Sequence, residues 1–243
     1  MIINSKTLTV RNDILLEQLV LVDGQPGCGK TLFTAIVAAM ERVELLNYSC
    51  ELENLCALNY LNKISSDAVE SMIRIQMDTV IYETMMSRRA NFRPGDLSSV
   101  FRDVDVWSYF KRLFSKGNED VPELIKKEKP ILHFATHNLL PFSEPIFNCL
   151  REKVSLIEVV RHPLYMLIQQ TLNHINTSAS SGTGRQFHLF IKHSNGQVPF
   201  WNYGQEELYL NSNPVERAIY EMQNLSELTE NYKKQKLQDN YSK

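Results

Sequence analysis

Long apolar runs and an excess of one charge are both missing from this chain of 243 residues. Its apolar stretches, at residues 19–22, 32–40 and 154–160, fall well short of the ~18 consecutive apolar residues that a membrane helix needs. The 26 basic and 28 acidic side chains leave a net charge of −2, which argues against nucleic-acid binding through bulk positive charge. We therefore expect neither a membrane span nor a nucleic-acid partner.

Paired cysteines and an export signal are also missing. Cys28, Cys50, Cys56 and Cys149 form no Cys-x-x-Cys pair and have no histidine at zinc-like spacing. The first residues show no basic start followed by an apolar run and a small-residue cleavage site. We expect reduced thiols and a cytoplasmic protein.

What the chain does contain is typical of a globular α/β protein, with 43% apolar and 22% charged residues. Short apolar runs at 19–22, 131–135 and 156–160 are each followed by a segment with helical spacing. This alternation predicts a central parallel sheet with helices on both faces, in three layers. We expect a single domain over residues 1–228 and a frayed polar tail over 229–243.

Two segments depart from that alternation. Apolar residues between about 51 and 116 follow helical spacing without a strand, which predicts a helical insertion. Residues 187–201 contain a turn at 194–196 between two short strand-like runs, which predicts a C-terminal β-hairpin, and Pro199 confines its second strand to an edge. Asn213 and Pro214 then supply the start of a helix.

The most specific motif follows the first apolar run. It reads Gly24-Gln25-Pro26-Gly27-Cys28-Gly29-Lys30-Thr31 and satisfies the phosphate-loop pattern G-x-x-x-x-G-K-[ST] between a predicted strand and a predicted helix. Glycines let successive backbone N–H groups turn toward a phosphate, and the helix N-terminus and Lys30 add positive charge there. Thr31 would bind the metal of a magnesium nucleotide. The alternative is a glycine-rich turn that binds nothing, which would leave Lys30 unexplained.

An acidic residue that ends a second apolar strand usually accompanies such a loop, and no clean example occurs here. Asp103 and Asp105 lie in a segment that alternates apolar and charged residues, and Glu158 lies inside a strand-like run. Each fits a surface or strand-end carboxylate better than a metal ligand, so we assign no metal-binding residue.

Two further segments follow predicted strands: Thr136-His137-Asn138-Leu139-Leu140-Pro141 and Val159-Val160-Arg161-His162-Pro163. Together with the glycine-rich loop, they make the chain resemble the sulfotransferases that use 3′-phosphoadenosine 5′-phosphosulfate (PAPS), over roughly residues 19–42 and 130–174. In the family's loop, approximately Pro-basic-Ser-Gly-Thr-Thr, Pro26, Gly29 and Thr31 agree. Cys28 stands in place of serine, Gly27 in place of the basic residue, and Lys30 where threonine is usual.

The resemblance implies roles for two residues outside the loop. The family's catalytic histidine follows a Lys-Thr pair, and His137 follows Thr136, although Ala135 occupies the lysine position. The family's Arg-x-Pro segment binds the 3′-phosphate and matches Arg161 and Pro163, while the serine expected eight residues after the arginine is Gln169.

Residue chemistry supports the same two positions. Histidine exchanges a proton near neutral pH, and His137 follows a strand, where α/β sheets build their sites. The guanidinium of Arg161 suits phosphate or sulfate oxygens. The alternatives are a capping or packing histidine and a surface ion pair.

Three hypotheses follow. The first is a transferase that moves a sulfuryl group from PAPS to the hydroxyl or amine of an unidentified acceptor, with Lys30 and His137 as catalytic residues. The second is an ATP-dependent kinase or nucleoside triphosphate hydrolase that uses magnesium with the intact Gly-Lys-Thr sequence. The third is a nucleotide-binding module without turnover. Magnesium dependence separates the first two.

Overall fold

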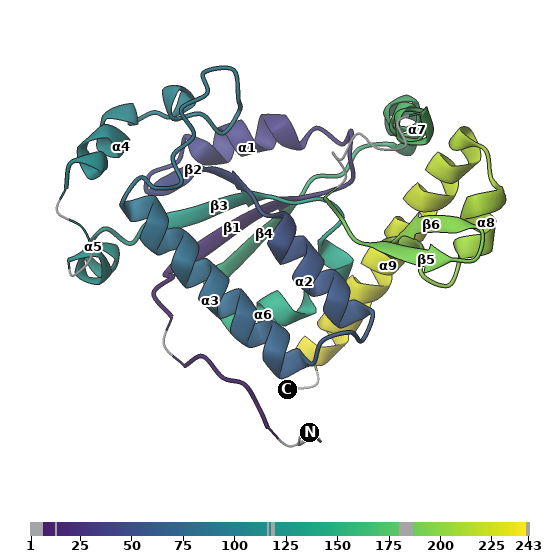
Figure 1. Ribbon diagram of the computed structural model, residues 1–243, viewed down its shortest axis with the longest axis horizontal. Helices are drawn as coiled ribbons and strands as arrows, with labels where there is room; N and C mark the ends of the chain where they lie inside the picture. Colours follow the sequence, from purple (N-terminus) through teal and green to yellow (C-terminus); the bar gives the residue numbers. More distant parts are fainter. Residues whose placement is uncertain (1–6, 13, 116, 118–119, 180–186, 242–243) are drawn as a thin grey trace.

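A four-stranded sheet lies at the centre of the molecule (Figure 1). The computed structural model describes residues 7–12, 14–115, 117, 120–179 and 187–241. The strands are β1 (Gln18–Asp23), β2 (Val43–Tyr48), β3 (Ile131–Ala135) and β4 (Val154–Glu158). They are parallel throughout, in the order β2-β3-β1-β4. The predicted α/β class and central parallel sheet are therefore confirmed.

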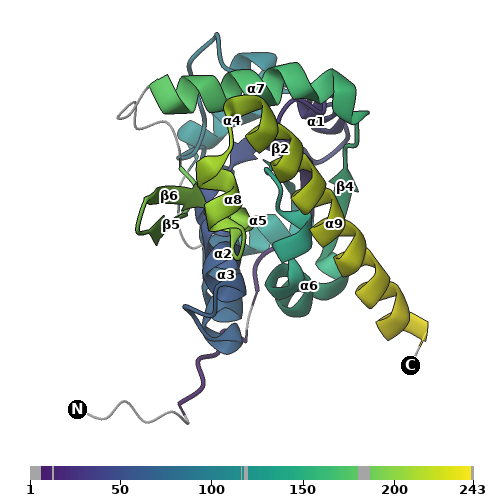
Figure 2. The ribbon, with the colours of Figure 1, turned by 90° about the vertical axis from the view of Figure 1, so that its right-hand side faces the viewer.

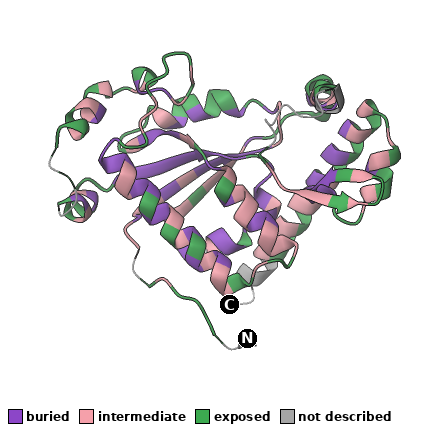
Figure 3. Cartoon of the chain, viewed as in Figure 1, coloured by how far each residue is buried: buried purple, intermediate pink, exposed green. Residues whose placement is uncertain are grey.

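Helices cover both faces of this sheet, as predicted (Figures 1 and 3). Along β1, Leu19 and Leu21 pack into the main apolar core, whereas Val20 and Val22 point to a smaller core on the opposite face. The main core lies under α2 (Cys50–Tyr60), α3 (Ser66–Met85) and α6 (Glu144–Leu150). The smaller core lies under α1 (Lys30–Ala38) and α7 (Pro163–Ala179). Sheet and helices form the expected three layers.

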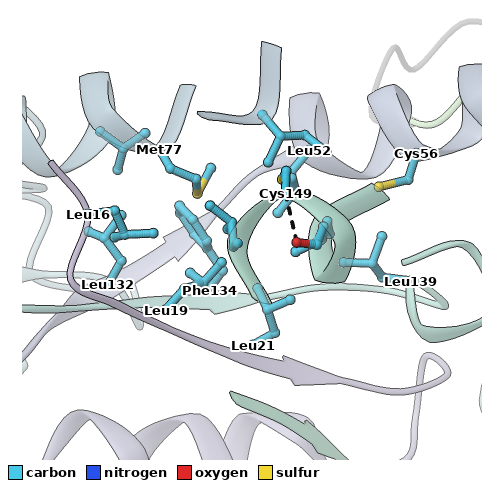
Figure 4. Packing of buried hydrophobic residues seen from close by; sticks show 14 of the residues in the cluster. Leu16, Leu19, Leu21, Leu52, Cys56, Met77, Leu132, Phe134, Leu139 and Cys149 are labelled. Carbon is cyan, nitrogen blue, oxygen red and sulfur yellow. Dashed lines mark hydrogen bonds between the residues drawn. The ribbon is translucent and has the colours of Figure 1, made fainter. Parts of the chain in front are cut away.

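The main core is centred on β3 and α3 (Figure 4). Phe134 of β3 and Met77 of α3 are fully buried there, together with Leu52 of α2 and Cys149 of α6. Large apolar side chains at this depth are the main favourable contribution to folding.

The segment between β2 and β3 is helical, as its spacing predicts. After α2 and α3 it contains the short 3-10 helix η1 (Val100–Arg102), α4 (Val106–Leu113) and α5 (Val121–Glu128). Among the described residues its only strand-like pairing is a single bridge between Asn91 and Ser99. The helical insertion is confirmed.

The predicted hairpin is also present. It consists of β5 (Phe190–His193) and β6 (Gly196–Pro199), with Pro199 at the edge of a separate two-stranded sheet. The remaining short elements are η2 (Leu140–Phe142), η3 (Arg151–Lys153), η4 (Phe200–Asn202) and α8 (Glu206–Asn211).

The final helix corrects the expectation of a frayed tail after residue 228. It is α9 (Pro214–Tyr241), and Asn213 caps its start by accepting hydrogen bonds from the N–H groups of Val215 and Glu216. Two lysines beyond residue 228 bind the body of the protein: Lys233 pairs with Glu158 of β4 at 2.7 Å, and Lys236 pairs with Glu144 of α6 at 3.2 Å. The polar composition of this segment reflects a solvated helix face (Figure 2).

Every cysteine is a free thiol, as expected from the spacing. Within the described part of the chain, no helix combines the length and apolar character needed to cross a membrane.

Phe134→Ala is expected to lower the free energy of unfolding by about 3–5 kcal/mol, because it leaves a cavity in the main core. Chemical denaturation monitored by circular dichroism measures this loss. Phe114→Ala is the matched control, since that ring is 87% exposed and its removal should change stability by no more than about 0.5 kcal/mol. Equal effects of the two variants would contradict the assignment of Phe134 to the core.

Candidate functional site

Three segments that follow strands meet at the carboxyl edge of the sheet. Residues 24–29 follow β1, residues 136–139 follow β3, and residues 159–162 follow β4. Because β1 lies between β3 and β4, the three segments are neighbours at the position where α/β sheets bind ligands. The structure thus brings Lys30, His137 and Arg161 to the same edge, as the sequence predicts.

The glycine-rich loop has a backbone that other residues would not adopt. Gly24 has φ +147°, and a Cβ there would lie 2.5 Å from the carbonyl oxygen of Val159 and 2.8 Å from Sγ of Cys28. Gly29 has φ +103°, and a Cβ there would meet no atom within 4 Å. The first glycine permits close packing against the neighbouring strand, and the second leaves open space at the start of α1.

The start of α1 is uncapped. Gly29 is its N-cap, no side chain accepts a hydrogen bond from its first turn, and no acidic residue lies in that turn. The first N–H groups of a helix have no partner inside the helix and carry the positive end of its dipole. This end of α1 therefore suits an anion.

The carbonyl oxygens of the loop are occupied by side-chain donors. Nζ of Lys30 donates to the carbonyls of Gly24 and Gln25, at 2.5 and 3.3 Å. Gln170 Nε2 donates to Pro26, at 2.8 Å, and Arg161 Nη1 donates to Gly27, at 3.2 Å. These bonds satisfy the loop carbonyls, and the Gln25 carbonyl also accepts from the N–H of Cys28 at 3.2 Å.

Lys30 is buried, and its charge is held by neutral partners. Burial lowers the pKa of its ammonium group, and the nearby Cys28, Asp23 and Glu53 partly offset that effect. Only carbonyl oxygens hydrogen-bond to it among the described residues. An anion bound beside the ammonium would therefore stabilise its charged form.

The remaining loop residues have packing and support roles. Gln25 Nε2 lies 3.4 Å from the carbonyl oxygen of Met222 and 3.5 Å from Oγ of Ser226, which ties the loop to α9. Cys28 is buried in the smaller core. Thr31 is exposed on the first turn of α1. The loop is thus fixed from α7, α9 and the β4–α7 connection.

Arg161 lies on the surface beside the loop. Besides its bond to Gly27, its guanidinium stacks over the ring of Tyr165, with Cζ 5.5 Å from the centroid. Gln169, at the position where the family has serine, also lies against the loop, because a Cβ on Gly27 would be 3.3 Å from its Cβ and Cγ. Arg161 thus places a second positive charge beside the loop, and no acidic side chain pairs with it among the described residues.

His137 has a partner that the sequence did not predict. Its backbone N–H donates to Oε1 of Glu53 at 2.7 Å, and its Nδ1 lies 3.4 Å from the same oxygen. Glu53 belongs to the first turn of α2 and is mostly buried, while the His137 ring is 47% exposed. The carboxylate therefore fixes the backbone and one ring nitrogen, and the ring remains open to a ligand.

A second histidine faces this region. Burial, together with the neighbouring His137, lowers the pKa of His188 to about 4. Its ring packs between Phe190 and Trp201, with centroid distances of 4.5 and 4.7 Å. Near neutral pH the imidazole of His188 is therefore uncharged, and it adds no positive charge beside His137. His133 is fully buried in β3, and burial lowers its pKa to about 4.

The carboxylates considered as metal ligands have structural partners. Asp105 caps α4 by accepting from the N–H of Ser108, and Glu158 pairs with Lys233. Asp103 lies in the same connection and accepts from the N–H of Asp105. In the described residues no cluster of three or more His, Cys, Asp or Glu side chains has an arrangement that could hold a metal ion.

Asp23, the last residue of β1, is a buried carboxylate that the sequence did not single out. Its Oδ1 accepts from the hydroxyl of Thr136 at 2.9 Å and from the N–H of Leu139 at 3.1 Å, and its Oδ2 accepts from the N–H of Leu140 at 2.8 Å. Its oxygens are therefore committed to the segment that carries His137.

Comparisons of the chain with protein-family models, with curated proteins and with solved structures find no match in any of the three.

Asp23→Asn is expected to destabilise the protein by about 1–3 kcal/mol, because an amide nitrogen would face the N–H of Leu140 or the donors of Leu139 and Thr136. Thermal unfolding of the ligand-free protein checks this. Glu123→Gln, which neutralises an exposed carboxylate paired with Lys126, is the control and should have almost no effect. An unchanged stability of Asp23→Asn would contradict the structural role of this carboxylate.

Proposed function

We propose that the chain binds a nucleotide donor at residues 24–31 and transfers a sulfuryl group from PAPS to the hydroxyl or amine of an acceptor. The observation that carries this proposal is the position of Arg161, whose guanidinium contacts Gly27 beside Lys30 and the uncapped start of α1. A donor with phosphates at both its 5′ and 3′ positions needs two separated anion sites, and this edge of the sheet offers two.

The first anion site is formed by the loop and Lys30. Residues 24–31 would hold the 5′-phosphosulfate, and its positive partners would be the N–H groups at the start of α1 and the ammonium of Lys30, which otherwise donates to the carbonyls of Gly24 and Gln25. During transfer the S–O bond to this oxygen breaks, the electron pair stays on the leaving adenosine 3′,5′-bisphosphate, and Lys30 stabilises the developing charge. Arg161 holds the 3′-phosphate.

His137 supplies the base. Its half-exposed ring takes the proton of the acceptor as the acceptor oxygen or nitrogen forms its bond to sulfur. Glu53 is a positioning residue, because it holds the backbone N–H and Nδ1 of His137 rather than the acceptor. In the sulfotransferases a lysine assists the leaving group, and Ala135 occupies its position in this chain. Lys30 therefore takes this role alone.

An ATP-dependent kinase or nucleoside triphosphate hydrolase is the second candidate. The exposed Thr31 directly after Lys30 favours it, since this hydroxyl suits a magnesium ion. Against it, Asp23 is committed to three protein donors and Glu53 to His137, so neither of these carboxylates is free to support the ion.

A thermal-shift panel tests the proposal and separates the two candidates. We expect PAPS and adenosine 3′,5′-bisphosphate to raise the melting temperature without magnesium, since a ligand at 100 times its Kd stabilises the folded state by about 2.7 kcal/mol. Lys30→Ala should abolish the shift and keep the fold. Stabilisation by ATP or GTP only in the presence of magnesium would favour the kinase candidate, and no shift with any nucleotide would overturn both.

Arg161→Ala is expected to weaken adenosine 3′,5′-bisphosphate binding by about 1.5–3 kcal/mol, the cost of losing one charge-assisted contact. Affinity for adenosine 5′-phosphosulfate, which lacks the 3′-phosphate, should hardly change. Isothermal titration calorimetry measures both. Arg93→Ala removes an exposed arginine of the helical insertion and should leave both affinities unchanged. Equal losses for the two ligands in Arg161→Ala would contradict its role at the 3′-phosphate.

His137→Ala is expected to lower turnover by ~10²–10⁴-fold with nearly constant donor affinity, because it removes the general base. Glu53→Gln should have a smaller effect on turnover, since the amide oxygen can still accept from the backbone of His137. His193→Ala, at the end of β5, is the matched control. Parental turnover of His137→Ala would make this histidine structural and remove the base from the mechanism.

A further inference from the structure

Helix α7 exposes its apolar face and buries its polar one. Its buried side chains include Met166, Gln170 and His174, spaced four residues apart. Its exposed face carries large apolar side chains at helical spacing: Leu164, Tyr165, Ile168, Leu172 and Ile175. A helix at the surface of a monomer normally shows the reverse pattern. An exposed apolar face of this kind is typical of an interaction surface.

Helix α1 shows the same inversion on the same side of the sheet (Figure 1). Lys30 and Thr34 are buried with Val37, whereas Leu32, Phe33 and Ile36 of α1, and Met40 two residues after its end, are exposed. Together with those of α7 they make nine side chains, exposed by between 41% and 72%. We call these nine side chains the α1/α7 surface.

Helices α1 and α7 contribute no exposed charged residue to the α1/α7 surface, and in the described part of the chain charges lie only at its edges, where Arg161 stacks over Tyr165 and Glu41 and Arg42 follow Met40. Residues 163–179 contain no Asp, Glu, Lys or Arg, and the only charged residue of α1 is the buried Lys30. A helix that lies on a lipid surface normally carries Lys or Arg along its polar face, which α7 does not. In contrast, an apolar surface whose charges lie only at its edges can pair with its own copy without bringing like charges together at its centre.

The size of the α1/α7 surface also fits self-association. At about 150 Å² per large apolar side chain, and with about half of that exposed on average, the nine residues on this side of the sheet together present on the order of 800 Å²; each partner buries about that area in a standard interface. We propose that a second copy of this chain covers the α1/α7 surface in a two-fold symmetric dimer. This proposal does not depend on the sulfotransferase proposal.

Analytical ultracentrifugation of the full chain over a concentration series tests the dimer. We expect the parent to sediment as a dimer at micromolar concentration, and Ile168→Asp to raise the dimer dissociation constant by at least ~100-fold, because it places an unpaired charge in the apolar interface. Ile168 is 72% exposed, so its replacement should not disturb the core. Val104→Asp, at a 75% exposed site of the helical insertion, is the matched control and should remain dimeric.

A second measurement uses the unmodified protein. Backbone amides of α1 and α7 should exchange hydrogen more slowly as the protein concentration rises, whereas those of α4 should not change. A monomeric parent, or a dimer that persists unchanged in Ile168→Asp, would overturn the proposal. Binding of a monomeric parent to phosphatidylcholine–phosphatidylserine vesicles, lost in Ile168→Asp, would overturn it in favour of a lipid surface.

Discussion

The buried carboxylate of Asp23 determines how the candidate site is assembled. It ends β1, directly before the glycine-rich loop, and its two oxygens accept three hydrogen bonds from the segment that follows β3. Three donors satisfy a charge that would otherwise be costly to bury. The same bonds fix where the chain leaves β3, and hence where His137 lies relative to Lys30. The loop and the histidine are thereby held by one side chain, which is why a single substitution there should affect both.

The sequence is sufficient to predict the strands and helices whose patterns are local. The apolar runs of β1, β3 and β4, and the helical spacing of α1, α3 and α7, correspond to the observed elements. Strand β2 was not predicted, because Glu44 interrupts its apolar pattern and its burial depends on a distant partner. Arg112 of α4 binds that carboxylate at 2.8 Å, and Tyr109 donates to it at 2.9 Å. The extension of α9 past residue 228 was missed for the same reason, since Lys233 and Lys236 find their acidic partners on β4 and α6.

The candidate site likewise contains some residues whose position the sequence predicts and others whose position it does not. The loop residues are adjacent in sequence, and their spacing predicts their geometry; Arg161 and His137 follow predicted strands, so the parallel sheet places them. No spacing links Glu53 to His137, 84 residues later, or His188 to either of them. Their proximity follows from how α2 and the hairpin pack at the sheet edge, which single-sequence patterns do not encode. Buried charges with long-range partners are thus the part of this protein that required a structure.

The contact of Lys30 with its own loop has a consequence for how this protein tolerates mutation. Its acceptors are the carbonyl oxygens of Gly24 and Gln25, which every residue type possesses. A substitution of Gln25 therefore keeps the carbonyl oxygen that accepts from Lys30. A substitution of Gly24 is limited by the φ of that residue and by the clashes that a side chain would make with Val159 and Cys28. The position of the Lys30 ammonium group is therefore determined by the backbone of the loop and not by the side chains at positions 24 and 25. Variants of this protein that keep the fold should accordingly keep this conformation of Lys30. Among the loop residues, substitutions of the glycines should therefore be the least tolerated.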